Sequence, residues 1–448
     1  MSDPRAVPDA AALGAEMHAL VRELYPICRS ITGDGVRRTL ARLQREIPLA
    51  VHEVPSGTQV FDWTVPREWN IRDAWVKDAS GRRVIDFQRH NLHVVNYSVP
   101  VRRRMTLAEL RPHLHTLPEQ PDLIPYRTSY YQETWGFCLA HRDLQQLPEG
   151  EYEVCIDSTL ADGHLTYGEC LLPGETDEEI LISCHTCHPS LADDNLSGVV
   201  VATFLARHLA QRPRRHACRF LFLPGTIGSI TWLALHEQQA RRIRHGLVLT
   251  CIGDRGGFTY KRSRRGDAAI DTAVAHVLKH QPRPSTLLDF KPYGYDERQY
   301  CSPGFDLAVG CLMRSHYGEF PEYHTSADNP DFVDAGQLAD AFATVLSVFD
   351  VLEHDRRYVN LSPMCEPQLG RRGLYGAMGG SRIQDLQLAL LWVLNQSDGR
   401  ASLLDIAERS GFPFTTLQEA ARLLLEHDLL APADPAQGDQ VPSTSLRA

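Results

Sequence analysis

The sequence predicts an α/β protein: a mixed, mostly parallel wound sheet with an inserted mainly-β domain and a C-terminal winged-helix domain. From residue 178 onward, apolar strand-like runs alternate with helical segments, which is typical of a sheet covered on both faces. Between residues 51 and 172, short β-type runs are separated by Pro, Gly and Asp turns, and helical periodicity is sparse. Residues 382–433 have the helix-turn-helix rhythm of a winged helix.

These observations set the expected boundaries. The α/β domain is built from two segments, and the inserted domain lies between them. The predicted ranges are 1–50 and 173–358 for the α/β domain, 51–172 for the inserted mainly-β domain, 359–435 for the winged-helix domain and 436–448 for a disordered tail.

The bulk composition is that of a globular protein with two or three domains. The chain has 448 residues, 43% of them hydrophobic and 23% charged. Its net charge of −10 argues against nucleic acid as the main partner. The start of the chain lacks a signal-peptide pattern, and no apolar run approaches the roughly 20 residues of a membrane span. Eleven cysteines without a regular spacing fit a reducing compartment. We therefore expect a cytoplasmic protein that binds neither nucleic acid nor membrane.

The N-terminal segment, residues 15–46, is expected to be helical, with Met17, Leu20, Val21 and Leu24 on one apolar face. The stretch CRSITGDG, residues 28–35, interrupts it. Its glycines favour a plain turn, and the alternative is a substrate-facing loop in which Arg29 attracts an anion. In the inserted domain, the aromatic residues of TSYYQETWGFCL (128–139) are either core residues or the wall of a binding site.

In the α/β domain, strands are expected at 180–184, 219–223, 245–250 and 307–313, with a further amphipathic helix at 335–355. Residues 362–380 then read as a linker. The second helix of the winged-helix domain, near 415–427, is acidic, whereas a helix meant for the major groove of DNA should be basic. We therefore interpret this domain as an element for packing or protein contact.

The stretch 180–198, ILISCHTCHPSLADDNLSG, carries the strongest chemical signal. An apolar strand leads into His185 and His188, and Asp193 and Asp194 precede the next helix. Imidazole and carboxylate groups are the ligands of a divalent transition metal, above all zinc. The alternative is a polar loop that caps the helix. Other strands of this region also end in Asp or His, and a parallel sheet gathers such ends in one crevice.

Several motifs together resemble the zinc aminopeptidase superfamily, which includes bacterial leucyl aminopeptidases and glutaminyl cyclases. More closely, the chain resembles an aminopeptidase-like family, associated by name with polysaccharide biosynthesis, that has an inserted β domain and a C-terminal winged helix. The motifs are YPICRSITGDG (25–35), CHPSLADDNLSG (187–198), TIGS (226–229), DERQYCSPGF (296–305) and PEYHTSADN (321–329).

The resemblance implies a site for one or two zinc ions. Asp194 corresponds to the metal-bridging aspartate, Asp254 to a later acidic ligand and His324 to the late histidine ligand. His185 stands where the superfamily has the histidine of a His-x-Asp motif, but the aspartate position is Cys187. Either His188 or the Cys187 thiolate would then replace that aspartate as a ligand.

The resemblance also implies a glutamate general base at the end of the second strand, where this chain has Gly225 followed by Thr226. Loss of a positioned base commonly costs roughly 10²–10⁴-fold in rate. Candidate replacements for that base are Asp193, His188, Glu297 and Glu322. Candidate substrate-binding residues are Arg29, Asp296, Glu297, Arg298 and Tyr323.

The expected function is a zinc-dependent aminopeptidase-like hydrolase that cleaves an amide or peptide bond in a small substrate and is impaired by Gly225. The alternative is a metal-binding pseudoenzyme that acts as a ligand- or protein-binding module. The sequence leaves open whether the chain forms a homo-oligomer.

Overall fold

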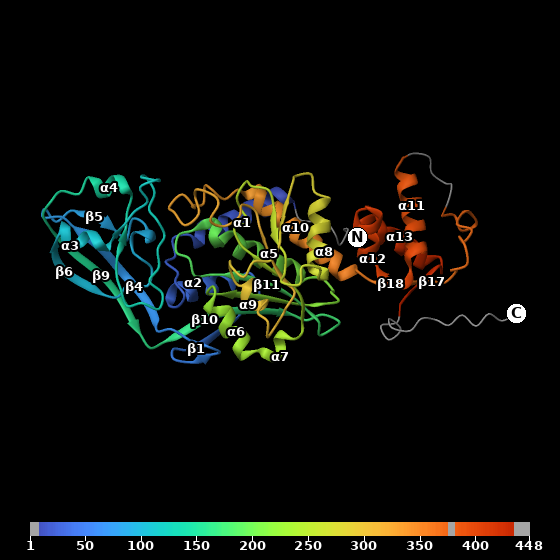
Figure 1. Cartoon of the computed structure of the whole chain (residues 1–448), viewed down its shortest axis with the longest axis horizontal. Helices are drawn as coiled ribbons and strands as arrows, with labels where there is room; N and C mark the ends of the chain where they lie inside the picture. The colour runs from blue at the N-terminus through green and yellow to red at the C-terminus, as the bar shows by residue number, and fades with distance from the viewer. Residues whose placement is uncertain (1–8, 375–380, 434–448) are drawn as a thin grey trace. The chain divides into compact units, whose positions relative to one another are not determined.

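The computed structural model describes residues 9–374 and 381–433 (Figure 1). The chain forms two compact units. The first contains Met1–Asp271 and Arg283–Leu346, and the second contains Thr272–Pro282 and Ser347–Ala448. The predicted tail, 436–448, and residues 375–380 of the predicted linker lie outside the described residues.

An eight-stranded sheet forms the centre of the first unit, in the order β1-β10-β12-β11-β13-β16-β14-β15. The neighbours β12–β11, β11–β13, β13–β16 and β14–β15 run parallel, and the other three pairs run antiparallel. This confirms the predicted mixed, mostly parallel sheet. The strands are β1 (Ala50–Pro55), β10 (His164–Leu172), β11 (Glu179–His185), β12 (Ala217–Leu223), β13 (Ile243–Leu249), β14 (Thr259–Lys261), β15 (Thr286–Leu288) and β16 (Val309–Met313).

Strands β11 and β12 are buried along their whole length, as expected for parallel strands covered on both faces. Helix α5 packs on one side of them and α1 packs against α5, while α6 lies on the other side (Figure 1). In α1, the four residues predicted for its apolar face are all buried. The helices of this region are α1 (Ala10–Leu24), α2 (Asp34–Leu43), α5 (Gly198–Leu209), α6 (Ile227–Leu235), α7 (Glu237–Ala240), α8 (Ala269–Lys279), α9 (Glu297–Tyr300) and α10 (Ala335–His354).

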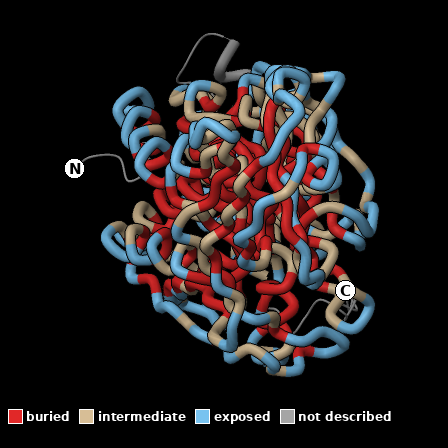
Figure 2. Tube along the Cα trace, turned by 90° about the vertical axis from the view of Figure 1, so that its left-hand side faces the viewer, coloured by how far each residue is buried: buried red, intermediate tan, exposed pale blue. Residues whose placement is uncertain are grey.

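Among the described residues, α10 is the one helix whose length and apolar composition would suffice to cross a membrane. However, 56% of its most apolar window is buried inside the structure, and the core helix of a folded domain meets the same criterion. Figure 2 shows how buried segments, in red, are enclosed by exposed loops and turns.

A separate four-stranded antiparallel sheet, in the order β5-β4-β9-β6, lies in the inserted region and has its own apolar core. Its strands are β4 (Glu68–Lys77), β5 (Arg83–Asp86), β6 (Val101–Thr106) and β9 (Glu151–Ala161), with shorter elements β2 (Gln59–Val60), β3 (Trp63–Thr64), α3 (Leu107–Leu110), β7 (Leu114–His115), β8 (Phe137–Cys138) and α4 (His141–Gln145). The extra sheet therefore spans 68–161, within the predicted insertion of 51–172. The strands at the two ends of the predicted insertion, β1 and β10, pair with the large sheet instead. The sequence did not show this, because an alternating apolar pattern indicates a strand but not its partner.

The second unit contains the predicted winged helix. Its helices are α11 (Ser381–Gln396), α12 (Leu403–Ser410) and α13 (Phe414–Glu426), and its strands are β17 (Arg357–Asn360), β18 (Asp398–Ser402) and β19 (Leu430–Pro432). Helix α12 begins with a capping box between Ser402 and Asp405 and ends at Gly411, which adopts a positive φ. On α13, the exposed Arg422 pairs with Glu419 and Glu426, so the only cation predicted for this helix is neutralised.

Candidate metal centre

Four side chains converge at the carboxyl end of β11. His185 ends β11, His188 follows in the next loop, Asp194 lies in the irregular turn before α5, and His324 comes from the loop after β16. His185 Nε2 lies 2.8 Å from Asp194 Oδ1, and His324 Nε2 lies 2.9 Å from Asp194 Oδ2. His188 Nδ1 lies 3.3 Å from the same Oδ2. We call these four residues the histidine–aspartate cluster.

The fold fixes the turn that carries Asp194. The buried carboxylate of Asp328 accepts hydrogen bonds from the backbone N–H groups of Ala192, Asp193 and Asp194. These bonds hold residues 192–194 in a turn whose Asp194 and Asn195 have non-helical backbone angles. Asp328 belongs to the motif PEYHTSADN, but sequence reasoning gave it no role because an aspartate that supports a turn has no chemical signature.

Aromatic rings hold the imidazoles in place. Tyr295 stacks on His185 with ring centroids 4.4 Å apart, and Tyr323 stacks on His324 at 3.9 Å. The hydroxyls of Tyr295 and Tyr323 lie 2.8 Å apart, which links the two stacks. Tyr126, from the inserted region, meets both His188 and His324 edge-on at 5.0 Å.

The backbone on either side of His324 is paired with that of the inserted region. The N–H of Tyr126 donates to the carbonyl of His324 at 2.8 Å, and the N–H of Ser326 donates to the carbonyl of Ile124 at 2.9 Å. Pro125 and Thr325 form the β-bridge between them. His324 adopts a positive φ of 55°, a backbone conformation that a non-glycine residue keeps when its surroundings enforce it.

The electrostatics of the cluster suit a cation. Burial acts to raise the pKa of Asp194, but His188 and His185 outweigh it and hold this pKa well below its usual range. Burial lowers the pKa of His185 to about 4, and it lowers that of His324 despite Asp194. At neutral pH Asp194 is therefore a carboxylate, and His185 and His324 are neutral imidazoles, which are the protonation states that metal binding requires. One ligand atom each of His185, His188 and Asp194 lies within 4.8 Å of the others, so the residues fit a zinc ion.

Two predicted residues are engaged elsewhere. The carboxylate of Asp254 accepts hydrogen bonds from the N–H of Gly256 and from the N–H and hydroxyl of Ser315. Asp193 Oδ1 accepts from the N–H of Gly253 at 2.7 Å, and burial, followed by the charge of Asp254, raises its pKa well above the usual range. The structure thus joins Asp193 and Asp254 to the loops after β13 and β16. They make no contact with the cluster among the described interactions.

The residue of the loop after β13 that lies near the cluster is Cys251. It is fully buried, with a positive φ of 45°. Burial, and then the charges of Asp194 and Asp193, raise its pKa well above the usual range, so it is a neutral thiol. The sequence places Cys251 at the end of a strand with candidate chemistry but gives it no role, because one cysteine among eleven stands out only when its neighbours are known.

Position 225 is close to His185 and to a buried acid. A Cβ atom at Gly225 would lie 3.0 Å from the Cβ of His185 and 3.6 Å from Asp296 Oδ1. Asp296 Oδ1 accepts from the hydroxyl of Ser229 at 2.9 Å, while its Oδ2 has no partner among the described residues. Burial raises the pKa of Asp296 to about 7.

Cys187 does not have the state of a thiolate ligand. Its Sγ lies 3.8 Å from the carbonyl of Gly225, and burial raises the pKa of the thiol to about 12. Of the two replacements proposed for the missing His-x-Asp aspartate, the structure thus places His188 at Asp194 and leaves Cys187 as a neutral donor.

The predicted substrate-binding residues occupy different environments. Arg29 is buried, and its Nε and Nη1 donate to the carbonyls of His188 and Leu24, so it braces the loop of His188, while its Nη2 has no partner among the described residues. Glu297 is buried in an ion pair with Lys261. Arg298 has an Nε that is buried without a partner among the described residues. Glu322 is half-buried, and its carbonyl accepts from Thr325.

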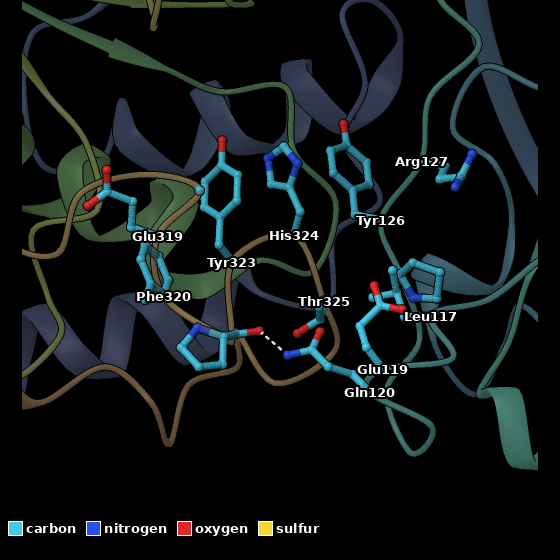
Figure 3. A pocket seen from close by; sticks show the side chains of 13 residues that line it. Leu117, Glu119, Gln120, Tyr126, Arg127, Glu319, Phe320, Tyr323, His324 and Thr325 are labelled. Atoms are coloured by element: carbon cyan, nitrogen blue, oxygen red, sulfur yellow. Dashed lines mark hydrogen bonds between the residues drawn. The ribbon is translucent and has the colours of Figure 1, made fainter.

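A pocket of about 680 Å³ opens beside His324 (Figure 3). One wall comes from the inserted region, residues 117–127, and the other from residues 318–325. Tyr126, Tyr323 and His324 stand side by side along it (Figure 3). Of the predicted substrate-binding residues, Tyr323 lines this pocket.

Comparison with known proteins agrees with this architecture. The model of a family described as a domain of unknown function, DUF4910, matches residues 18–355, and that of a winged helix-turn-helix family matches residues 356–432. A Clostridium acetobutylicum protein named as a polysaccharide biosynthesis protein with an aminopeptidase-like domain is 52% identical over 425 residues, which cover 95% of this chain and 98% of that protein. The chain belongs to this aminopeptidase-like family.

Solved structures extend the comparison to the family's fold. A crystal structure from Clostridium acetobutylicum matches with a TM-score of 0.91 at 51% identity, covering 95% of this chain and 97% of the other. A zinc aminopeptidase from Bacillus subtilis matches with a TM-score of 0.56 at 12% identity, covering 78% of this chain and 96% of the other. The family therefore shares the large mixed sheet of zinc aminopeptidases and adds a second antiparallel sheet and a winged helix.

Proposed function

We propose that the protein is a zinc-dependent hydrolase of aminopeptidase type that cleaves an amide or peptide bond in a small substrate. The observation that carries this proposal is the histidine–aspartate cluster at the carboxyl end of β11. The aminopeptidase-like name of the 52% identical relative supports it. That name also mentions polysaccharide biosynthesis, and we propose that the substrate is an amide-bearing intermediate of such a pathway. Cytoplasmic localisation and the absence of nucleic-acid and membrane partners stay predictions.

The residues of the cluster would hold the metal through Asp194, His185 and His188, whose ligand atoms lie within 4.8 Å of one another. A zinc ion held there would supply Lewis-acid activation of a carbonyl group and of water. Catalytic zinc sites keep one coordination position open, so His324 would remain outside the ligand set during the reaction. Its Nε2 lies 2.9 Å from Asp194 Oδ2, which offers it a hydrogen-bond partner.

We propose that Asp296 handles the proton that a glutamate at position 225 would otherwise take. Its Oδ1 lies 3.6 Å from the position where such a side chain would begin, and its Oδ2 is unpartnered among the described residues. A pKa of about 7 suits a group that accepts and returns a proton near neutral pH. The earlier candidates fit this role less well, because Asp193 is directed to Gly253 and Glu297 is paired with Lys261.

Hydrolysis of aminoacyl-anilides by the zinc-loaded protein tests the proposal. Native protein should hydrolyse at least one member of the panel, and Asp296→Asn should lower the rate by about 10²–10⁴-fold while zinc content stays the same. Absence of hydrolysis across the panel, in zinc-replete protein, would count against the hydrolase assignment.

A second function, a metal-binding pseudoenzyme, is favoured by Gly225 and by the presence of four potential protein ligands. If all four bound one ion, no coordination position would remain for water, as in structural zinc sites. Activity that appears only in Gly225→Glu would support the pseudoenzyme. The new Cβ would meet His185 at 3.0 Å, so His185 must move by a few tenths of an ångström in this variant. Its zinc content must therefore be measured beside its activity.

A further inference from the structure

The pocket beside His324 is preformed. The amide of Gln120 donates to the carbonyl of Pro321 at 2.8 Å and so links the two segments that line it (Figure 3). The main-chain pairing of Tyr126 with His324 and of Ile124 with Ser326 fixes the two walls against each other. A volume of about 680 Å³ lies within the usual range of small-molecule sites, roughly 300–1,000 Å³.

The pocket combines apolar walls with charged groups. Leu117, Phe320 and the rings of Tyr126 and Tyr323 supply the apolar surface. Glu319 Oε1 lies 3.0 Å from Nδ1 of His316, so this acid is already paired with a histidine. Arg127 lines the pocket, is exposed, and makes no ion pair or side-chain hydrogen bond within the described part of the chain.

The backbone of Arg127 is anchored beside the pocket that this residue lines. Its carbonyl accepts from the N–H of Asn96 at 2.8 Å, and the residues on either side pair with His324 and Asn96. Arg127 also directly follows Tyr126, whose ring packs on two histidines of the cluster. A substrate whose reacting amide lies at the cluster can therefore extend past Tyr126 toward Arg127.

We propose that this pocket binds the leaving portion of the substrate and that Arg127 recognises a carboxylate on it. The proposal rests on the hydrolase function proposed above and names the class of its substrate: amides whose leaving amine carries an acid group, as in a dipeptide with a free C-terminus. A guanidinium suits this task because it is always charged and its planar fork matches both oxygens of a carboxylate. The aromatic walls would cover the apolar part of the same portion.

Binding of alanyl-glycine and alanyl-glycinamide to the full-length protein tests the proposal, because the two probes differ mainly in the negative charge. Isothermal titration uses chelator-treated protein, so that no metal ion takes up the carboxylate or supports hydrolysis. Native protein should bind the acid about fivefold more tightly than the amide, given a partly exposed ion pair. Arg127→Gln should abolish this preference and leave amide binding unchanged.

Two further variants control the result. Arg103→Gln, an exposed arginine of β6 in the same inserted region, should keep the preference. Glu119→Gln, which removes a pocket acid, should keep or increase it. The proposal is overturned if the acid is not preferred by native protein, if Arg127→Gln keeps the preference, or if Arg103→Gln removes it equally.

Hydrolysis by zinc-loaded protein separates this proposal from the hydrolase assignment. A preference in binding without any hydrolysis would retain the carboxylate site and remove the hydrolase function. Hydrolysis with equal kcat/KM for the acid and the amide would retain the function and remove the carboxylate site.

Discussion

Replacement of Asp194 by asparagine should abolish high-affinity zinc binding. Asp194 is fully buried, and its two oxygens lie within 3.3 Å of a nitrogen on each of three histidines. Asparagine keeps the shape of the side chain but removes its charge, so the cluster would present only neutral donors to the cation. The three histidines would remain in place.

The magnitude follows from the energetics of four-ligand zinc sites. Such sites bind with an apparent free energy of about 10–16 kcal/mol at pH 7, or roughly 2.5–4 kcal/mol for each ligand. Since 1.4 kcal/mol corresponds to tenfold, Asp194→Asn should weaken zinc binding by about 10²–10³-fold. Competition with a chromophoric chelator measures the affinity, and elemental analysis of the purified protein measures the stoichiometry.

The neighbouring Asp193 provides a matched control, because it is equally buried and takes the same substitution. Its Oδ1 accepts a hydrogen bond from the N–H of Gly253, and the side-chain oxygen of asparagine can accept the same bond. Asp193→Asn should therefore keep zinc affinity within about threefold, less than the 1.4 kcal/mol of a tenfold change. If both variants lose zinc equally, or if Asp194→Asn keeps native affinity, the reasoning about the cluster is wrong.

Three further predictions concern stability and partners. Arg219→Met should lower the free energy of unfolding by about 3–5 kcal/mol in denaturant titrations, because it leaves the buried Glu179 without its bidentate partner. Arg72 forms an exposed ion pair, so Arg72→Met should lower the free energy of unfolding by less than about 1 kcal/mol. Equal losses in Arg219→Met and Arg72→Met would contradict the argument. Burial lowers the pKa of His245 to about 3 in the folded protein, below its value of about 6.5 in the unfolded chain. The folded state therefore favours the neutral imidazole, and its contribution to the free energy of unfolding is complete above pH 6.5 and is lost as the pH falls toward 3. His245→Gln should flatten this dependence in thermal unfolding, and an unchanged slope would refute the assignment. Mobility-shift assays should detect no binding of duplex DNA by the winged-helix unit at physiological salt, and a salt-sensitive shift would contradict that prediction.

Much of the fold was accessible from the sequence because buried parallel strands appear as short apolar runs that end in polar residues. That pattern located the ends of β11 and β16, and hence His185, Asp194 and His324. The pairing of β1 and β10 with the large sheet was not accessible, since β1 pairs with a strand more than 100 residues away, and β10 pairs with β12 across the whole of β11 and α5.

Residues that act through their surroundings were harder to interpret. Arg29 carries a charge that suggested a ligand for anions, yet it is buried as a brace for the loop of His188. Asp254 follows its strand as a metal ligand would, but three hydrogen-bond donors occupy its carboxylate. The pocket beside His324 could not be foreseen, because its walls come from two segments about 200 residues apart.

The short main-chain pairing between residues 124–126 and 324–326 limits how the protein can be engineered. A shortened protein from which the insertion has been excised would lose the main-chain hydrogen bonds that hold His324 at a positive φ. The insertion therefore cannot be transferred by itself. A chimera that places it on an aminopeptidase without an insertion must also carry the loop that contains residues 324–326.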